Sequence, residues 1–212
     1  FRSQSPSTTA PVTDDTTPAL NIGTVPTGQT PALYVDGAKV PATYDPVTGT
    51  LTPSSPLADG PHQLAYSLTD PAGNESPVSS ALPVTVDTTA PVVTLSAGQH
   101  AGPGGNAVIR SSETGTAYLV NSTVTVSSLA NITGAADANW NSVSVSLAST
   151  DTNLATTGLT PGTYKLYSVD AAGNLSAASA RAWPSSTACP RATKWFWATA
   201  VRQRFGMPQH FR

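Results

Sequence analysis

The residues that could do chemistry in this chain are few and widely spaced. Asp14, Asp15 and Asp87 lie at two copies of an Asp-Thr-Thr phrase, and their carboxylates are the hard oxygen ligands that Ca²⁺ prefers. The alternative is that they cap turns by accepting hydrogen bonds from nearby backbone N–H groups. No EF-hand loop accompanies them. Calcium at these three aspartates is therefore a hypothesis, and no other cofactor is expected.

The pattern of the other polar residues predicts that the chain is not an enzyme. His62, His100 and His210 share no metal-ligand spacing, and no Gly-x-Ser-x-Gly nucleophile elbow occurs. The carboxylates are scattered, without a paired acid and base. Asp70 and Asp170 each begin an Asp-x-Ala-Gly-Asn stretch, which is typical of a turn rather than of metal ligation.

Charge is unevenly distributed along the 212 residues. All twelve acidic residues precede position 171, so the chain up to residue 180 carries a net charge of −8, and the rest carries +6. An acidic body argues against nucleic acid as a partner, because phosphate binding needs a basic face. A single cysteine, Cys189, excludes an intrachain disulfide, and no apolar run approaches the roughly 18 residues of a transmembrane helix.

An internal repeat organises the chain. Residues 70–76 (DPAGNES) recur 100 positions later as residues 170–176 (DAAGNLS). Residues 15–18 (DTTP) are echoed by residues 87–91 (DTTAP), and each phrase precedes an alternating apolar segment. These repeats predict a linker or the end of a preceding repeat over 1–13, one module over 14–87 and a second over 88–182. Because the chain begins with Phe1 and not with Met, we expect it to be cut from a longer protein.

Within each module the apolar residues alternate with a period of two. Residues 142–147 (SVSVSL) and 164–169 (YKLYSV) show it most clearly. Turn signals such as Asp36-Gly37 and Asp59-Gly60 separate the runs, and no helical pattern lies between them. The sequence therefore predicts an all-β fold, built as a sandwich or barrel in each module.

The stretches DDTTPAL, LADGPHQLAYSLTDPAGNES and VDTTAPVV resemble the bacterial Ig-like repeats of large surface adhesins and biofilm-associated proteins. The resemblance covers residues 14–182 and is closest in the first module and its linker. It implies two tandem Ig-like Greek-key β-sandwich modules, located outside the cell or on the bacterial surface. It also implies that calcium between modules could stiffen such an array.

The tail over residues 183–212 departs from this pattern. It holds three of the four tryptophans and no acidic residue. A frameshifted reading frame, a membrane-surface segment and a linker to a further domain are three interpretations, of which the abrupt change in composition favours the first. An irregular tail outside the fold, beginning near Arg181, would leave the last strand of the second module incomplete.

The function implied is a structural spacer of a bacterial cell-surface adhesin or biofilm matrix protein, which extends a distal binding domain. Its partners would be neighbouring Ig-like repeats in the same chain, with glycan or host ligands bound by other domains. One alternative is a carbohydrate- or host-receptor-binding module with Trp140 and Tyr118 as surface stacking residues, although a lone tryptophan in a sandwich more often anchors the core. Another alternative is an accessory segment of a secreted hydrolase.

Overall fold

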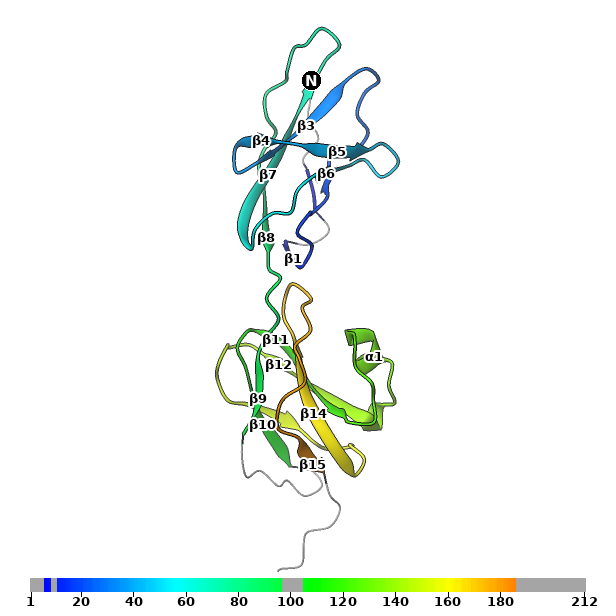
Figure 1. The fold of residues 1–212 in the computed structure, drawn as a ribbon, viewed down its shortest axis with the longest axis vertical. Coiled ribbons are helices and arrows are strands. Elements are labelled where there is room, and N and C mark those ends of the chain that lie inside the picture. The colour runs from blue at the N-terminus through cyan, green and yellow to red at the C-terminus, as the bar shows by residue number, and fades with distance from the viewer. Residues whose placement is uncertain (1–5, 9–10, 97–104, 186–212) are drawn as a thin grey trace, which may run out of the picture.

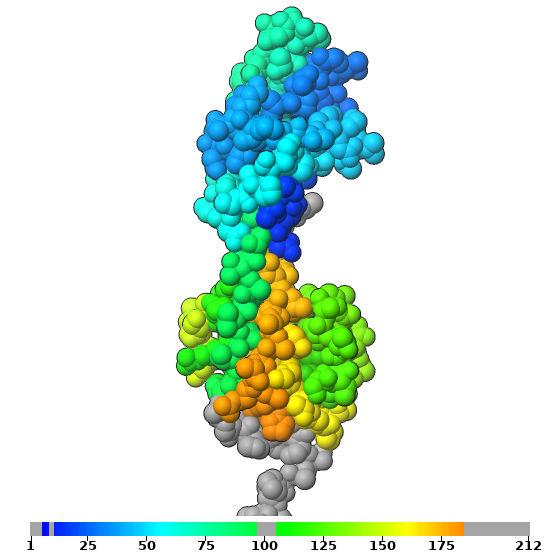
Figure 2. Space-filling view, in the orientation of Figure 1, coloured from blue at the N-terminus to red at the C-terminus, as the bar shows by residue number. Residues whose placement is uncertain are grey.

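The computed structural model describes residues 6–8, 11–96 and 105–185, and they form two tandem Ig-like β-sandwich modules arranged end to end (Figure 1). The predicted all-β fold is thus confirmed. Figure 2 shows the two bodies meeting at a narrow neck. Among the described residues, no helix has the length and apolar character needed to cross a bilayer.

The amino-terminal module consists of two sheets. One has the strand order β1-β8-β7-β3-β4 and the other β2-β6-β5. Its strands are β1 (Val12–Thr13), β2 (Leu20–Asn21), β3 (Thr30–Val35), β4 (Ala38–Val40), β5 (Ala42–Asp45), β6 (Thr50–Pro53), β7 (Gly60–Thr69) and β8 (Leu82–Val86). Alternate residues of the facing strands fill the core, as the period of two requires. Leu20, Leu33, Leu51, Leu64 and Tyr66 are among the side chains buried there.

Strand β1 lies before the start that the repeat predicts for the first module. Val12 and Thr13 pair in parallel with Thr85 and Val86 of β8, so these residues belong to the sheet and not to a free linker. The second Asp-Thr-Thr phrase leads into β9 (Val93–Leu95), which pairs with β10 (Asn106–Ser111). The first leads into β2, which pairs with β6. The two phrases therefore introduce strands with different partners.

The carboxy-terminal module also has two sheets, ordered β13-β10-β9 and β12-β11-β14-β15. The remaining elements are β11 (Gly115–Asn121), α1 (Leu129–Thr133), a 3₁₀ turn (Asp137–Asn139), β12 (Trp140–Val145), β13 (Thr152–Ala155), β14 (Gly162–Val169) and β15 (Trp183–Ser185). The core between the sheets includes Ile109, Leu119, Leu154, Tyr164 and Leu166.

The interpretation of residues from Arg181 on as a tail outside the fold is wrong for residues 183–185. Strand β15 pairs with β14, and Trp183, opposite Tyr164, is only 2% exposed in the core. Pro184 is tolerated because β15 is an edge strand, where one backbone N–H has no ladder partner to lose. Strand β15 is therefore the last strand that the repeat pattern predicted to be incomplete, and Trp183 is its residue in the core. Residues 186–212 lie outside the described part of the chain.

Candidate functional site

The linker between the modules is hydrogen-bonded from both sides. In the amino-terminal module, the Asp59 carboxylate accepts hydrogen bonds from the Thr88 hydroxyl at 2.9 Å and from the Thr88 backbone N–H at 3.3 Å. In the carboxy-terminal module, the Asn174 side-chain amide donates to the backbone carbonyl of Asp87 at 2.7 Å. Consecutive residues of the linker are thus fixed to different modules, which restrains the angle between them.

Asn174 is held in place by the turn that Asp170 begins. The Asp170 Oδ1 atom accepts hydrogen bonds from the backbone N–H groups of Ala172, Gly173 and Asn174, at 2.8–2.9 Å. Its Oδ2 atom accepts from the Asn174 side-chain amide at 2.9 Å. Gly173 adopts a positive φ of 104°, which a side chain would disfavour. The predicted turn role of Asp170 is therefore confirmed, and the same turn aims Asn174 at the linker.

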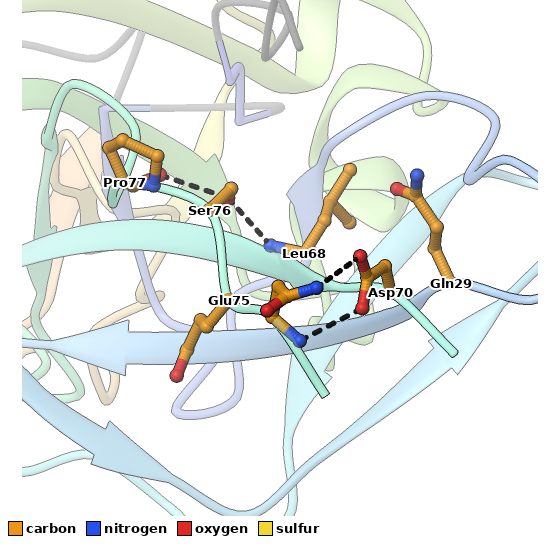
Figure 3. A pocket seen from close by; sticks show the side chains of 7 residues that line it. Gln29, Leu68, Asp70, Glu75, Ser76 and Pro77 are labelled. Carbon is orange, nitrogen blue, oxygen red and sulfur yellow. Dashed lines mark hydrogen bonds between the residues drawn. The ribbon is translucent and has the colours of Figure 1, made fainter. Parts of the chain in front are cut away.

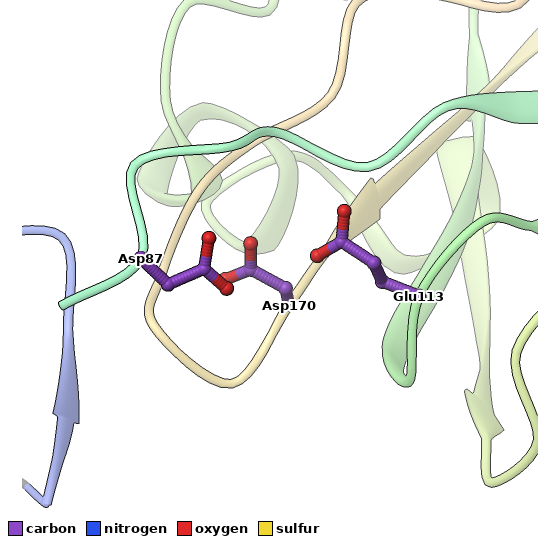
Figure 4. Close-up of side chains that lie close together, drawn as sticks. All are labelled: Asp87, Glu113 and Asp170. Atoms are coloured by element: carbon purple, nitrogen blue, oxygen red, sulfur yellow. The ribbon is translucent and has the colours of Figure 1, made fainter. Parts of the chain in front are cut away.

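Three carboxylates converge beside this contact (Figure 4). Asp87 comes from the linker, Glu113 from the turn between β10 and β11, and Asp170 from the turn after β14, and one oxygen of each lies within 4.8 Å of the others. Burial, together with the negative charges of Asp87 and Asp170, raises the pKa of Glu113 above its ordinary value. A cation would relieve this repulsion, and the all-oxygen ligand set fits Ca²⁺.

Of the three aspartates predicted as calcium ligands, only Asp87 lies in this cluster. The pairing of β1 with β8 brings Asp14 and Asp15 to the same end of the module as Asp87. However, the Asp15 carboxylate accepts hydrogen bonds from the Thr17 backbone N–H and hydroxyl at 2.8 and 3.0 Å, as in the turn interpretation. Asp87 both lies in the carboxylate cluster and caps its own turn, because its Oδ1 atom accepts a hydrogen bond from the Thr89 backbone N–H at 3.1 Å.

The corresponding end of the amino-terminal module has no such carboxylate cluster among the described residues. Asp70 and Asn74 repeat the internal hydrogen bonds of Asp170 and Asn174. Beside them lies a cavity of about 410 Å³, shown in Figure 3, whose lining includes Gln29. The Gln29 Oε1 atom is buried and has no hydrogen-bond partner among the residues that the structure describes. The turn is thus repeated, whereas a cluster of three carboxylates is found, among the described residues, at the junction alone.

Comparison with known proteins gives a family match for the amino-terminal module. Residues 3–88 match the family model described as the bacterial Ig-like domain. The amino-terminal module belongs to the bacterial Ig-like domain family. No curated protein matches the chain.

Several solved structures are similar to this chain. The fibronectin(III)-like modules of Clostridium thermocellum CbhA share 12% identity, with a TM-score of 0.49, over 85% of this chain and 94% of that one. The Bacteroides ovatus glucan-utilization protein SGBP-B, in complex with a mixed-linkage heptasaccharide, shares 17% identity, with a TM-score of 0.29, over 89% and 49%. A tetra-tandem repeat from the extending region of a large adhesion protein shares 16% identity, with a TM-score of 0.32, over 86% and 49%. The chain thus spans about half the length of the last two.

The bacterial Ig-like module and its carboxy-terminal neighbour differ on one sheet face. In the first, Glu75 accepts hydrogen bonds from Ser67, from Tyr34 at 2.8 Å and from Lys39 at 2.9 Å. These hydrogen bonds lower the pKa of Glu75 to about 2, that from Ser67 most. In the carboxy-terminal module, 100 residues later, Tyr167 stands at the position of Ser67 and Leu175 at the position of Glu75.

In the carboxy-terminal module this face is apolar and covered. Tyr167 and Leu175 pack with Tyr118 and Val120 against Ile132 of α1. An apolar sheet face needs such a cover, because it would otherwise be exposed to water. Tyr118 is 9% exposed, so its predicted alternative role as a surface stacking residue is wrong. Trp140 packs on the edge of the same cluster and is half-buried.

Proposed function

We propose that the chain is a non-catalytic spacer of a bacterial cell-surface adhesin or biofilm matrix protein, which acts outside the cell. The observation that supports this most directly is the linker, which is hydrogen-bonded to Asp59 on one side and to Asn174 on the other. A spacer has to hold its modules apart at a restrained angle, and hydrogen bonds from both modules to consecutive linker residues do this without a large interface.

The proposal is tested by measuring how far the two modules move relative to each other. Asp59→Ala and Asn174→Ala each remove one side of the restraint. Small-angle X-ray scattering of the full chain should then show a broader distribution of maximum dimensions, and the double variant should show the broadest. Residual dipolar couplings on the two modules should likewise become less correlated.

Asn74→Ala is the matched control for Asn174→Ala. Asn74 makes the same hydrogen bonds inside its own turn, but no hydrogen bond joins it to a linker among the described residues. It should leave the scattering profile unchanged. If Asn74→Ala and Asn174→Ala broaden the distribution equally, the turn matters for folding only and the restraint assigned to the linker is wrong.

We further propose that Ca²⁺ binds the cluster of Asp87, Glu113 and Asp170 and stiffens the same junction. The support is the convergence of the linker residue Asp87 with Glu113 and Asp170 of the carboxy-terminal module, within 4.8 Å, and the raised pKa of Glu113. This assignment keeps Asp87 from the ligands predicted from sequence and replaces Asp14 and Asp15 by residues of the second module.

A further inference from the structure

A second concave surface lies at the far end of the carboxy-terminal module, away from the junction. It is a groove of about 540 Å³ whose lining includes Asp137, Trp140, Asn141, Ser142 and Thr157. Val120 of β11 pairs with Trp140 at one end of β12, whereas Gly115, next to the turn of Glu113, pairs with Val145 at the other. The groove is therefore separated from the carboxylate cluster by the length of β12.

The aromatic part of the groove is fixed in position. Trp140 lies with its ring centroid 5.9 Å from that of Tyr118, at an interplanar angle of 48°. Its indole N–H donates to the Ala135 carbonyl at 3.4 Å. One side of the ring thus packs on the covered sheet face, while the residue also contributes to the groove. A ligand stacking there would meet an indole that has already lost its rotational freedom.

The polar wall is equally constrained. The carbonyl of Ala138, in the 3₁₀ turn, accepts hydrogen bonds from the Thr160 backbone N–H at 2.9 Å and from the Tyr164 hydroxyl at 3.3 Å. Asn141 donates through its side-chain amide to the Ala155 carbonyl at 2.8 Å, which joins β12 to the end of β13. These contacts hold the residues on both sides of Trp140 and preorganise the groove.

Three polar side chains in the groove are unused by the fold. Those of Asp137, Ser142 and Thr157 are exposed, and none makes a side-chain hydrogen bond with another described residue. Together they offer a carboxylate acceptor and two hydroxyls around a half-buried indole. Among the described residues, no lysine or arginine lines the groove and Asp137 carries the single formal charge, so an anionic ligand is disfavoured.

We propose that this groove binds a neutral saccharide. A pyranose ring has an apolar C–H face, which stacks on an aromatic side chain, and a rim of hydroxyls, which needs both donors and acceptors. Trp140 provides the stacking surface, and Asp137 and Thr157 fix the orientation of the hydroxyls. A proline-rich peptide needs an aromatic-lined groove with few polar groups, and here the lining around one indole is polar.

The test is a titration of the full chain with each of four oligosaccharides: cellohexaose, xylohexaose, mannohexaose and chitohexaose. Binding is measured by isothermal titration calorimetry and by the NMR signal of the Trp140 indole N–H in ¹⁵N-labelled protein. At least one oligosaccharide should bind and shift that signal. Asp137→Ala and Thr157→Ala should each weaken the binding about tenfold, the loss expected for one well-placed hydrogen bond. Trp140→Ala should abolish it, with circular dichroism to check the fold.

Ser142→Ala and Ser144→Ala form the matched pair. Both serines are exposed and lie two residues apart on β12, hence on the same face, but only Ser142 lines the groove. Binding should weaken in the first and be unchanged in the second. Absence of binding by all four sugars, or binding of decaproline in their place, would overturn the assignment. Because Asp137→Ala and Thr157→Ala alter exposed side chains, their result stands even if Trp140→Ala does not fold.

Discussion

At the level of single residues, His62 is surrounded by hydrogen-bond acceptors. Its Nδ1 atom lies 2.8 Å from the Asp36 carboxylate and its Nε2 atom 2.9 Å from the Ala58 carbonyl. Only the imidazolium carries a proton on both nitrogens and satisfies both contacts. The hydrogen bond to Asp36, followed by that to Ala58, raises the pKa of His62 above 6.5.

His62 should therefore make the stability of the amino-terminal module depend on pH. A raised pKa in the folded state contributes stability that is fully present below the unfolded value of about 6.5. This stability is lost as the pH rises through the folded pKa. The melting temperature should fall by a few degrees from pH 6 to pH 8.5, and His62→Gln should remove most of the fall. An equal fall in the variant would assign the effect to other groups.

Glu75 should make the stability of the amino-terminal module depend on pH in the acidic range. Its pKa is lowered from 4.5 to about 2, so its contribution is present above pH 4.5 and lost as the pH falls toward 2. Glu75→Gln should lower the urea midpoint at pH 6 and have no effect near pH 2. Asp14→Asn is the control, because Asp14 is an exposed carboxylate of the same module. If both variants lose the same amount at pH 6, the Glu75 hydrogen bonds have no specific effect.

The sequence indicated part of the junction cluster but not its composition. Asp87 could be found because it lies in a repeated phrase. Glu113 and Asp170 could not be assigned to the same site, because they come from turns 57 residues apart that only the sandwich topology brings together. His62 carried no signal of its ion pair either, since Asp36 lies 26 residues before it.

At the level of elements, α1 was not foreseen because five residues are too few to show a helical period. Its stability comes from tertiary packing of Ile132, which is 0% exposed. Strand β14 was predicted well, because its buried residues alternate along Gly162–Val169. For β12 the alternation located the strand but not its bounds, because the strand ends at Val145 and Leu147 is 64% exposed. Strand β15 was missed, since three residues with a central proline show no alternation.

Ile132→Ala should destabilise the carboxy-terminal module by about 2–5 kcal/mol, the range for truncating a buried isoleucine. Thr133→Ala changes the next residue of α1, which is exposed, and should cost much less. Differential scanning calorimetry should show the transition of the carboxy-terminal module moving down while that of the amino-terminal module stays in place. Equal effects of the two substitutions would show that α1 is not packed as described.

Trp183 provides an independent test of β15. Trp183→Ala should cost about 3–5 kcal/mol by leaving a cavity in the core. Trp183→Phe should cost less, because the buried indole N–H has no hydrogen-bond partner in the described part of the chain and its removal relieves that defect. Chemical denaturation followed by circular dichroism measures both. Loss of less than about 0.5 kcal/mol in Trp183→Ala would place this residue outside the core.

At the level of the whole molecule, Ca²⁺ should raise the stability of the full chain. At a concentration one hundred times its Kd, it should add about 2.7 kcal/mol relative to a chelator, seen as a higher melting temperature. Glu113→Gln should abolish this increase. In chelator it should instead be more stable than the parent, because burial, followed by the charges of Asp87 and Asp170, disfavours the ionised form of Glu113. Identical melting of the parent chain in Ca²⁺ and in chelator would exclude the ion.

The parallel pairing of β1 with β8 has a mechanical consequence. Tension on the chain pulls β1 back toward its start and β8 onward toward the linker, so adjacent parallel strands are drawn in opposite directions. The hydrogen bonds from the Thr85 N–H to the Pro11 carbonyl and from the Asp87 N–H to the Thr13 carbonyl, at 2.8 and 2.9 Å, are then sheared together. They cannot be peeled apart one at a time, and the amino-terminal module resists extension where the pulling force enters it.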